Sequence, residues 1–344
     1  MLLRIFDFMS VLKYCSAFLF LGLGYWSLIG SGIITYALVI FSFIVIPLLE
    51  LILPEKKSAN DVKSLWLYDL ILYAIVPGYF YLFYLFLSTI GAEQSVASLI
   101  GKISAMGLLC GIFGINMAHE LGHRKRKFDQ VLAQGLLLSA QYTHFFIEHN
   151  RGHHKRVGTP EDSATARKGE HIYKFWFRVI FGAYKSAWNL EKDKLERSNK
   201  SAWSLNNDMI LYAIVQIVLL SLVYGFFGLQ VLMYYGIVCF IGILLLESIN
   251  YIEHYGLTRK KISNSSYERV NDIHSWNSDH ILGRALLFEL TRHSHHHANS
   301  LLTYQALESR KDASQLPTGY PGMLLLSLIP PLWFRVMHKR LPSD

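Results

Sequence analysis

Histidines are the residues of this sequence that are best suited to chemistry. The chain has 15 of them, and most fall in four clusters between apolar stretches: HELGH at 119–123, EHNRGHH at 148–154, NYIEH at 250–254 and RHSHHH at 292–297. Residues four apart share one face of a helix, and this spacing recurs in three of the clusters. Since imidazole is a common ligand of transition metals, the clusters predict a shared metal site.

Nine histidines are expected to form this site. They are His119, His123, His149, His153, His154, His254, His293, His296 and His297. One zinc ion takes only four ligands, so nine imidazoles can give four or five nitrogens to each of two metal ions. Imidazole binds iron, copper, zinc and nickel, so the spacing alone does not select the metal. Oxidation of an apolar substrate would require a redox metal, either iron or copper.

The histidine clusters have two other interpretations. HExxH is also the signature of zinc proteases, but that function needs a further ligand and a soluble cleft, and here the motif is one of four clusters. A metal transporter would carry ionisable residues along a path at mid-bilayer depth. The histidines of this chain lie outside the apolar stretches, which argues against transport.

The composition indicates a membrane protein. Of 344 residues, 52% are hydrophobic and 17% charged, and the mean hydropathy is +0.28. Soluble domains carry about 25% charged residues, and disorder requires low hydrophobicity. We expect an all-α integral membrane protein, folded as a single domain over 1–344, with a helical cap carrying the histidines. Since a spanning helix needs about 20 apolar residues, six spans are predicted near 14–30, 33–53, 66–90, 96–118, 209–229 and 232–252.

The charges of the connecting segments predict the orientation. Arg4 and Lys13 precede the first span, and Lys56, Lys57 and Lys63 follow the second. The other cytoplasmic segments are expected to be those rich in Lys and Arg, 119–208 and 255–344, whereas 30–32, 91–95 and 228–231 contain neither residue. The positive-inside rule therefore predicts both termini and the metal site on the cytoplasmic side of the inner membrane. The same rule accounts for most of the +8 net charge, so nucleic acid is not an expected partner.

Three further apolar stretches are interpreted separately. The first apolar stretch is compatible with a cleavable signal peptide, but no small-residue cleavage site closes it, and we expect a retained span. The stretch 131–147 is expected to be a helix buried against the bundle or entering it partway. The stretch 320–334, interrupted by Pro330 and Pro331, is expected to lie at the membrane interface.

The motifs resemble those of the membrane histidine-box di-iron family, which includes fatty-acid desaturases, sterol hydroxylases and alkane monooxygenases. N-x-x-H-E-L-G-H, F-I-E-H-N-R-G-H-H, N-Y-I-E-H-Y-G-L and R-H-S-x-H-H-A resemble the four signatures of the alkane 1-monooxygenases. H-S-W-N-S at 274–278, T-P-E-D at 159–162 and L-P-T-G-Y-P at 316–321 do so as well. The resemblance extends over about 45–340, nearly the whole chain.

This resemblance implies a fold, a cofactor and a reaction. It implies six spans and two non-haem irons held by the nine histidines. The implied reaction is terminal hydroxylation of medium- to long-chain n-alkanes with O2. The alkane would enter from the membrane lipid. Electrons would come from rubredoxin, which is reduced by rubredoxin reductase. The three cysteines form no CxxC pair, so we expect the rubredoxin to be a separate protein.

Several further residues are expected near the metals. Glu247 and Asn250 precede His254 by two turns and one turn of the expected helix. Polar groups at the membrane edge are costly without a partner. Both residues are therefore predicted to act in catalysis, the alternative being a simple interhelical hydrogen bond. Carboxylates beside the histidines are expected to orient imidazoles by accepting their N–H groups: Glu120, Glu148, Glu253, Asp279 and Glu289.

Three points concern specificity and partners. His295 stands where the family usually has Asp, and we expect it either to change the hydrogen bonding around the metals or to add a ligand. The basic residues 124–127, with Arg151, Lys155 and Arg156, would steer an acidic electron carrier or simply obey the positive-inside rule. Ser42 is expected to leave room in the alkane channel for longer chains.

The nearest alternative function is a related oxygenase acting on xylene-type or terpene methyl groups, with the same histidine clusters. A desaturase is less compatible, because the N-Y-x-E-H-Y-G pattern at 250–256 is absent from desaturases.

Overall fold

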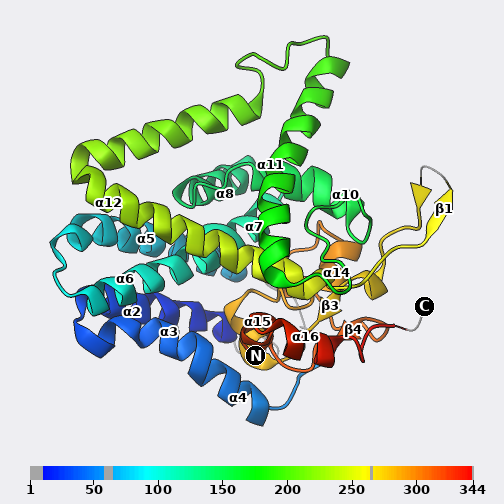
Figure 1. The fold of residues 1–344 in the computed structure, drawn as a ribbon, viewed down its shortest axis with the longest axis horizontal. Helices are drawn as coiled ribbons and strands as arrows, with labels where there is room; N and C mark the ends of the chain where they lie inside the picture. Colours follow the sequence, from blue (N-terminus) through cyan, green and yellow to red (C-terminus); the bar gives the residue numbers. More distant parts are fainter. Residues whose placement is uncertain (1–10, 58–64, 264–265, 343–344) are drawn as a thin grey trace. The chain divides into compact units, whose positions relative to one another are not determined.

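The computed structural model describes residues 11–57, 65–263 and 266–342. Arg4 and Lys63, used above for the topology, lie outside the described residues. The chain is mostly helical (Figure 1). It divides into two compact units. The first unit comprises Met1–Val45, Asp61–Phe146 and Glu191–Leu245, and the second comprises Ile46–Asn60, Ile147–Leu190 and Leu246–Asp344.

The first unit contains the apolar helices. Its elements are η1 (Lys13–Cys15), α2 (Ser16–Ile29), η2 (Gly32–Tyr36), α3 (Ala37–Ile40), η3 (Phe41–Val45), α5 (Leu65–Thr89), η4 (Ile90–Ala92), α6 (Val96–Leu109), η5 (Cys110–Asn116), α7 (Met117–Gly122), α8 (Lys127–Ser139) and most of α12 (Asp208–His254). Helix α2 packs against α5 and α6, and α7 packs against α8. The short α9 (Phe145–Ile147) lies at the end of this unit.

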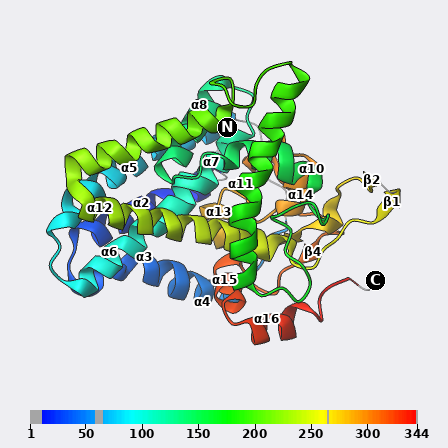
Figure 2. The ribbon, with the colours of Figure 1, turned by 45° about the horizontal axis from the view of Figure 1, so that its top comes forward.

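Four helices in the described part of the chain are long and apolar enough to cross a membrane: Gly32–Ile52, Trp66–Ala92, Val96–Gly122 and Asp208–His254. The last includes two of the predicted spans, because Gly228 has the non-helical angles φ 85 and ψ 171. Glycine adopts such a positive φ at no steric cost, and the two halves of α12 turn back on each other there (Figures 1 and 2). The predicted span near 14–30 corresponds to the 14-residue α2 and the short helix before it.

Glycines allow α6 and η5 to approach the second half of α12 closely. A Cβ added to Gly107 would lie 2.5 Å from the Ile241 side chain, and one added to Gly111 would lie 2.6 Å from Leu245. Small residues at such contacts let helix backbones pack tightly where lipid provides no hydrophobic driving force. These contacts hold the helix that leads to His119.

The second unit contains most of the histidines. Its elements are α4 (Ile46–Ile52), η6 (Glu148–His153), α10 (His154–Arg156), α11 (Ile172–Arg197, as far as Leu190), the end of α12, β1 (Lys261–Ser263), β2 (Ser266–Tyr267), η7 (Asp272–His274), β3 (Trp276–Asn277), α13 (Ile281–Leu286), α14 (His293–Ala298), η8 (Tyr304–Ala306), β4 (Ser314–Gln315), α15 (Tyr320–Ser327) and α16 (Pro330–Met337). Strands β1 and β2 pair antiparallel, and β3 and β4 pair parallel. These short strands are the one departure from the all-α expectation in the described residues.

Asn277 of β3 fixes the start of α14. Its side chain donates to the Ser294 hydroxyl (2.8 Å) and accepts from the Ser294 backbone N–H (2.8 Å). All of these groups are buried. Since His293 precedes Ser294, the H-S-W-N-S motif holds one of the histidine clusters in place.

Candidate metal centre

Four of the nine histidines form one buried group within the second unit. His153 comes from η6, His254 from the end of α12, and His293 and His297 from α14. One ring nitrogen of each lies within 4.8 Å of the others. The Nε2 atom of His293 is 3.1 Å from that of His254 and 2.9 Å from that of His297.

This arrangement fits a metal ion. A neutral imidazole has one N–H and one lone pair, so three Nε2 atoms facing one another leave lone pairs in opposition. Burial and the neighbouring histidines lower the pKa of His297 well below its usual value, which keeps that ring neutral. The Nε2 atom of His153 is buried and has no hydrogen-bond partner within the described part of the chain. A cation at the centre would satisfy these lone pairs together.

Asp162 orients His153. The carboxylate accepts from His153 Nδ1 at 2.9 Å, and both side chains are buried. Burial raises the pKa of Asp162, but the nearby His153 and hydrogen bonds from His153 and Thr165 outweigh it and lower the pKa to about 2. An ionised carboxylate on Nδ1 holds the proton there and turns the Nε2 lone pair inward. Asp162 was not predicted as an orienting residue, although the T-P-E-D motif contains it.

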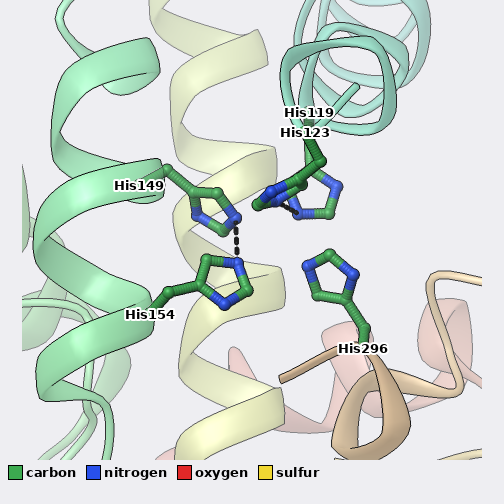
Figure 3. A group of neighbouring side chains, drawn as sticks. All are labelled: His119, His123, His149, His154 and His296. Carbon is green, nitrogen blue, oxygen red and sulfur yellow. Dashed lines mark hydrogen bonds between the residues drawn. The ribbon is translucent and has the colours of Figure 1, made fainter. Parts of the chain in front are cut away.

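The other five histidines are divided between the units, and Figure 3 draws them. In the first unit, His119 and His123 are one turn apart around α7, with their Nε2 atoms 3.3 Å apart. In the second unit, the Nε2 atoms of His149 and His154 are 3.0 Å apart (Figure 3). The ring of His296, from α14, lies 4.9 Å from that of His154 between centroids.

The local helix type explains why His149 pairs with His154. The segment η6 is a π-helix, in which hydrogen bonds join residues five apart. His149 therefore faces His154, and His153 belongs to the other group. The spacing of four predicted from an α-helix holds for His119 with His123 and for His293 with His297, but not for His149 with His153.

Glu247 and Asn250 lie on the last turns of α12. Both are buried, and the Asn250 amide donates to Glu247 at 2.9 Å. Burial lowers the pKa of His153, but Asp162 most strongly, and then Glu148 and Glu247, raise it above its usual value. Of these three carboxylates, Glu247 has the smallest effect on the pKa of His153.

The five carboxylates predicted to orient imidazoles differ in the side chains that they contact. Glu253 accepts from the Tyr320 hydroxyl at 2.8 Å and lies 3.1 Å from His293 Nε2. The other four accept from arginines: Glu120 from Arg124, Glu148 from Arg156, Glu289 from Arg284, and Asp279 from Arg292. The sequence analysis did not name these arginines as partners, although Arg124 follows Glu120 by four residues, a spacing at which helical side chains meet.

His295 belongs to neither histidine group. Its Nδ1 atom accepts from the backbone N–H of Glu308 at 2.9 Å. This geometry does not place His295 among the candidate ligands. His295 ties α14 to the segment after η8.

Comparison with known proteins identifies the family to which this chain belongs. The family model "Fatty acid desaturase" matches residues 95–325, which is more than half of the chain. The chain therefore belongs to the fatty acid desaturase family of membrane histidine-box proteins.

Similar proteins of named activity indicate the branch of this family to which the chain belongs. An alkane 1-monooxygenase of Pseudomonas putida is 40% identical over 82% of this chain and 70% of its own length. Alkane 1-monooxygenase 1 of Alcanivorax borkumensis is 47% identical over 67% of this chain and 57% of its own length. The hydroxylase component of the xylene/toluene monooxygenase of Pseudomonas putida is more distant, at 30% identity over 92% of this chain and 82% of its own length. The chain belongs to the alkane 1-monooxygenase branch of the oxygenases, which confirms the resemblance drawn from its motifs.

Proposed function

We propose that the protein hydroxylates the terminal methyl group of medium- to long-chain n-alkanes. The balanced reaction is RCH3 + O2 + 2e− + 2H+ → RCH2OH + H2O. The observation that carries the proposal is the buried group of four facing imidazoles, in a chain whose relatives are alkane 1-monooxygenases. An alkane C–H bond offers no charge, acid or leaving group, so acid–base catalysis alone is insufficient.

We propose that two iron ions occupy the site. His153, His254, His293 and His297 would hold one ion. The resemblance of the histidine motifs assigns the other five of the nine histidines to the second ion. Bound iron would supply the oxidising chemistry with O2, whereas zinc has no redox chemistry. The protein's own role is to fix the imidazoles, as Asp162 does for His153, and to exclude water. Glu247, with Asn250 as its hydrogen-bond donor, would move a proton at the edge of the four-histidine group.

The electrons would come from rubredoxin, with rubredoxin reductase. The basic segment 124–127 supports this partner only in part. Arg124 and Arg126 are paired with Asp69 and Asp129, so the exposed Lys125, Lys127 and Lys155 would steer an acidic carrier.

We propose that the chain crosses the inner membrane six times as one domain over 1–344. Helix α12 would cross twice, on either side of Gly228, and α2 would belong to the first crossing. Both termini and the metal site would face the cytoplasm. The alkane would enter from the bilayer, past the buried Ser42.

Product analysis tests this function. Iron-loaded protein would receive O2, rubredoxin and its reductase, and a panel of n-alkanes, p-xylene and a stearoyl substrate. We expect 1-alkanols from the wild type and from the control His171→Ala, a surface residue, and no product from His254→Ala. Benzylic alcohol as the main product would favour the second candidate, a xylene-type oxygenase, which the relative at 30% identity keeps open. An alkene would contradict hydroxylation.

A further inference from the structure

Helix α11 has one face that packs into the second unit. Phe175, Val179, Ala183 and Ala187 repeat every four residues and are at most 6% exposed. The Trp176 indole also donates to Ser248 on the end of α12 at 3.0 Å. This face fixes the rotation of α11 about its own axis.

The adjacent face carries a row of exposed aromatic side chains. Tyr173, Phe177, Phe181 and Tyr184 are 49%, 72%, 64% and 48% exposed. At 100° per residue they fall within a sector of about 80°. The rings of Phe177 and Phe181 are 5.0 Å apart between centroids. Single exposed apolar residues are ordinary, but a contiguous apolar row marks an interaction surface.

Cationic residues border this row on the side away from the buried face. Lys174 and Lys185 are exposed and lie about 100–120° around the helix from Tyr173. The order around α11 is therefore buried face, aromatic row and lysines. Helices that lie in the plane of a membrane interface have such an aromatic face and such a cationic border.

We propose that α11 lies in the membrane–water interface, with Phe177 and Phe181 inserted among the lipids and Lys174 and Lys185 at the level of anionic headgroups. The occupant of the aromatic row is thus the lipid bilayer. Continuity along the chain supports it, because only residues 198–207 separate α11 from α12, which is long and apolar enough to span. Trp203 and Leu205 in this connection are 80% and 66% exposed, and Trp is enriched at membrane interfaces.

A protein partner fits these observations less well. Lysine is depleted from the cores of protein interfaces, whereas lysines beside an aromatic row complement anionic lipid. The proposal concerns how the second unit is anchored, and it holds whichever substrate the enzyme oxidises.

Spin-label accessibility tests the proposal on the full chain. The label would be attached at Phe177→Cys or Phe181→Cys, with Asn189→Cys as the exposed control on the lysine side, each in a Cys15→Ser background. The protein would be placed in nanodiscs of phosphatidylcholine and phosphatidylglycerol. We expect the ratio of collisions with O2 to collisions with a water-soluble nickel chelate to be several-fold higher at 177 and 181 than at 189.

Two results would overturn the proposal. Equal ratios at 177, 181 and 189 would place the aromatic row in water. Shielding of 177 and 181 from both reagents, with dipolar broadening between labels, would assign the row to a second copy of the chain. The collision ratios and the dipolar broadening are measured without hydroxylase activity, so the test does not depend on the proposed reaction.

Discussion

Replacing Asp162 with Asn should weaken metal binding while leaving the fold in place. Asp162 and His153 are buried at 0% and 1% side-chain exposure and are joined at 2.9 Å. Asn keeps the size and one acceptor oxygen but loses the negative charge that fixes the proton on Nδ1. Loss of such a partner costs about 10- to 100-fold in metal affinity, which corresponds to about 1.4–2.8 kcal/mol.

Competition with an iron chelator, followed by metal analysis, measures this effect. Asp162→Asn should release iron at about 10- to 100-fold lower chelator concentration than the wild type. Asp162→Ala should also unfold more easily, by about 1–3 kcal/mol, because the buried Nδ1–H of His153 loses its acceptor. The matched control is Glu161→Gln, the neighbouring exposed carboxylate, which should behave as wild type. If Asp162→Asn kept its iron like the control, Asp162 would not orient a ligand.

The remaining predictions concern the support of the site and the substrate. Asn277→Ala should lower stability by about 1–3 kcal/mol in thermal unfolding, because buried groups of Ser294 lose their partner. An unchanged midpoint of thermal unfolding would show that Asn277 does not hold the start of α14. Gly319→Ala should also destabilise, since the new Cβ would lie 1.9 Å from a Glu50 carboxylate oxygen, and truncating Glu50 in the same chain should restore part of the loss. Burial raises the pKa of Glu170, but hydrogen bonds from Arg178 outweigh burial and lower the pKa overall. The ionised Glu170 therefore stabilises the folded protein above the ordinary carboxyl pKa of about 4.3. This stabilisation is lost as the pH falls through the lower pKa that Glu170 has in the folded protein. Glu170→Gln should therefore show a weaker loss of stability over this acid range by circular dichroism, and an identical acid titration would argue against the pair. Ser42→Trp should shift 1-alkanol products toward shorter chains, and an unchanged distribution would remove Ser42 from the channel.

The histidine groups that could hold a metal were foreseeable in part, because some of their spacing is local. Residues four apart on one helix meet whatever the tertiary fold, as His293 and His297 do. The pairing of His149 with His154, rather than with His153, could not be predicted, because it depends on the π-helical geometry of η6. The break in α12 lies at Gly228, one residue before the predicted end of the span near 209–229.

The residues that support the site were harder to predict. Asp162 follows His153 by nine residues, and no helical period relates the two. They meet because the loop after α10 folds back, held by the bond from Thr165 to Asp162 at 2.6 Å. The basic segment at 124–127 was expected at the surface, but Arg124 is buried and pairs with Asp69 of α5 at 2.6 Å. Such pairs arise from helix packing rather than from local sequence.

The number of iron ions per chain tests the central claim most directly. Protein purified in detergent and reconstituted with iron would be analysed for metal and protein together. We expect two irons per chain in the wild type and a loss of iron in His254→Ala, with His171→Ala unchanged. A wild-type protein that holds a single ion, or a His254→Ala variant that keeps both, would contradict the assignment of the nine histidines to a di-iron centre.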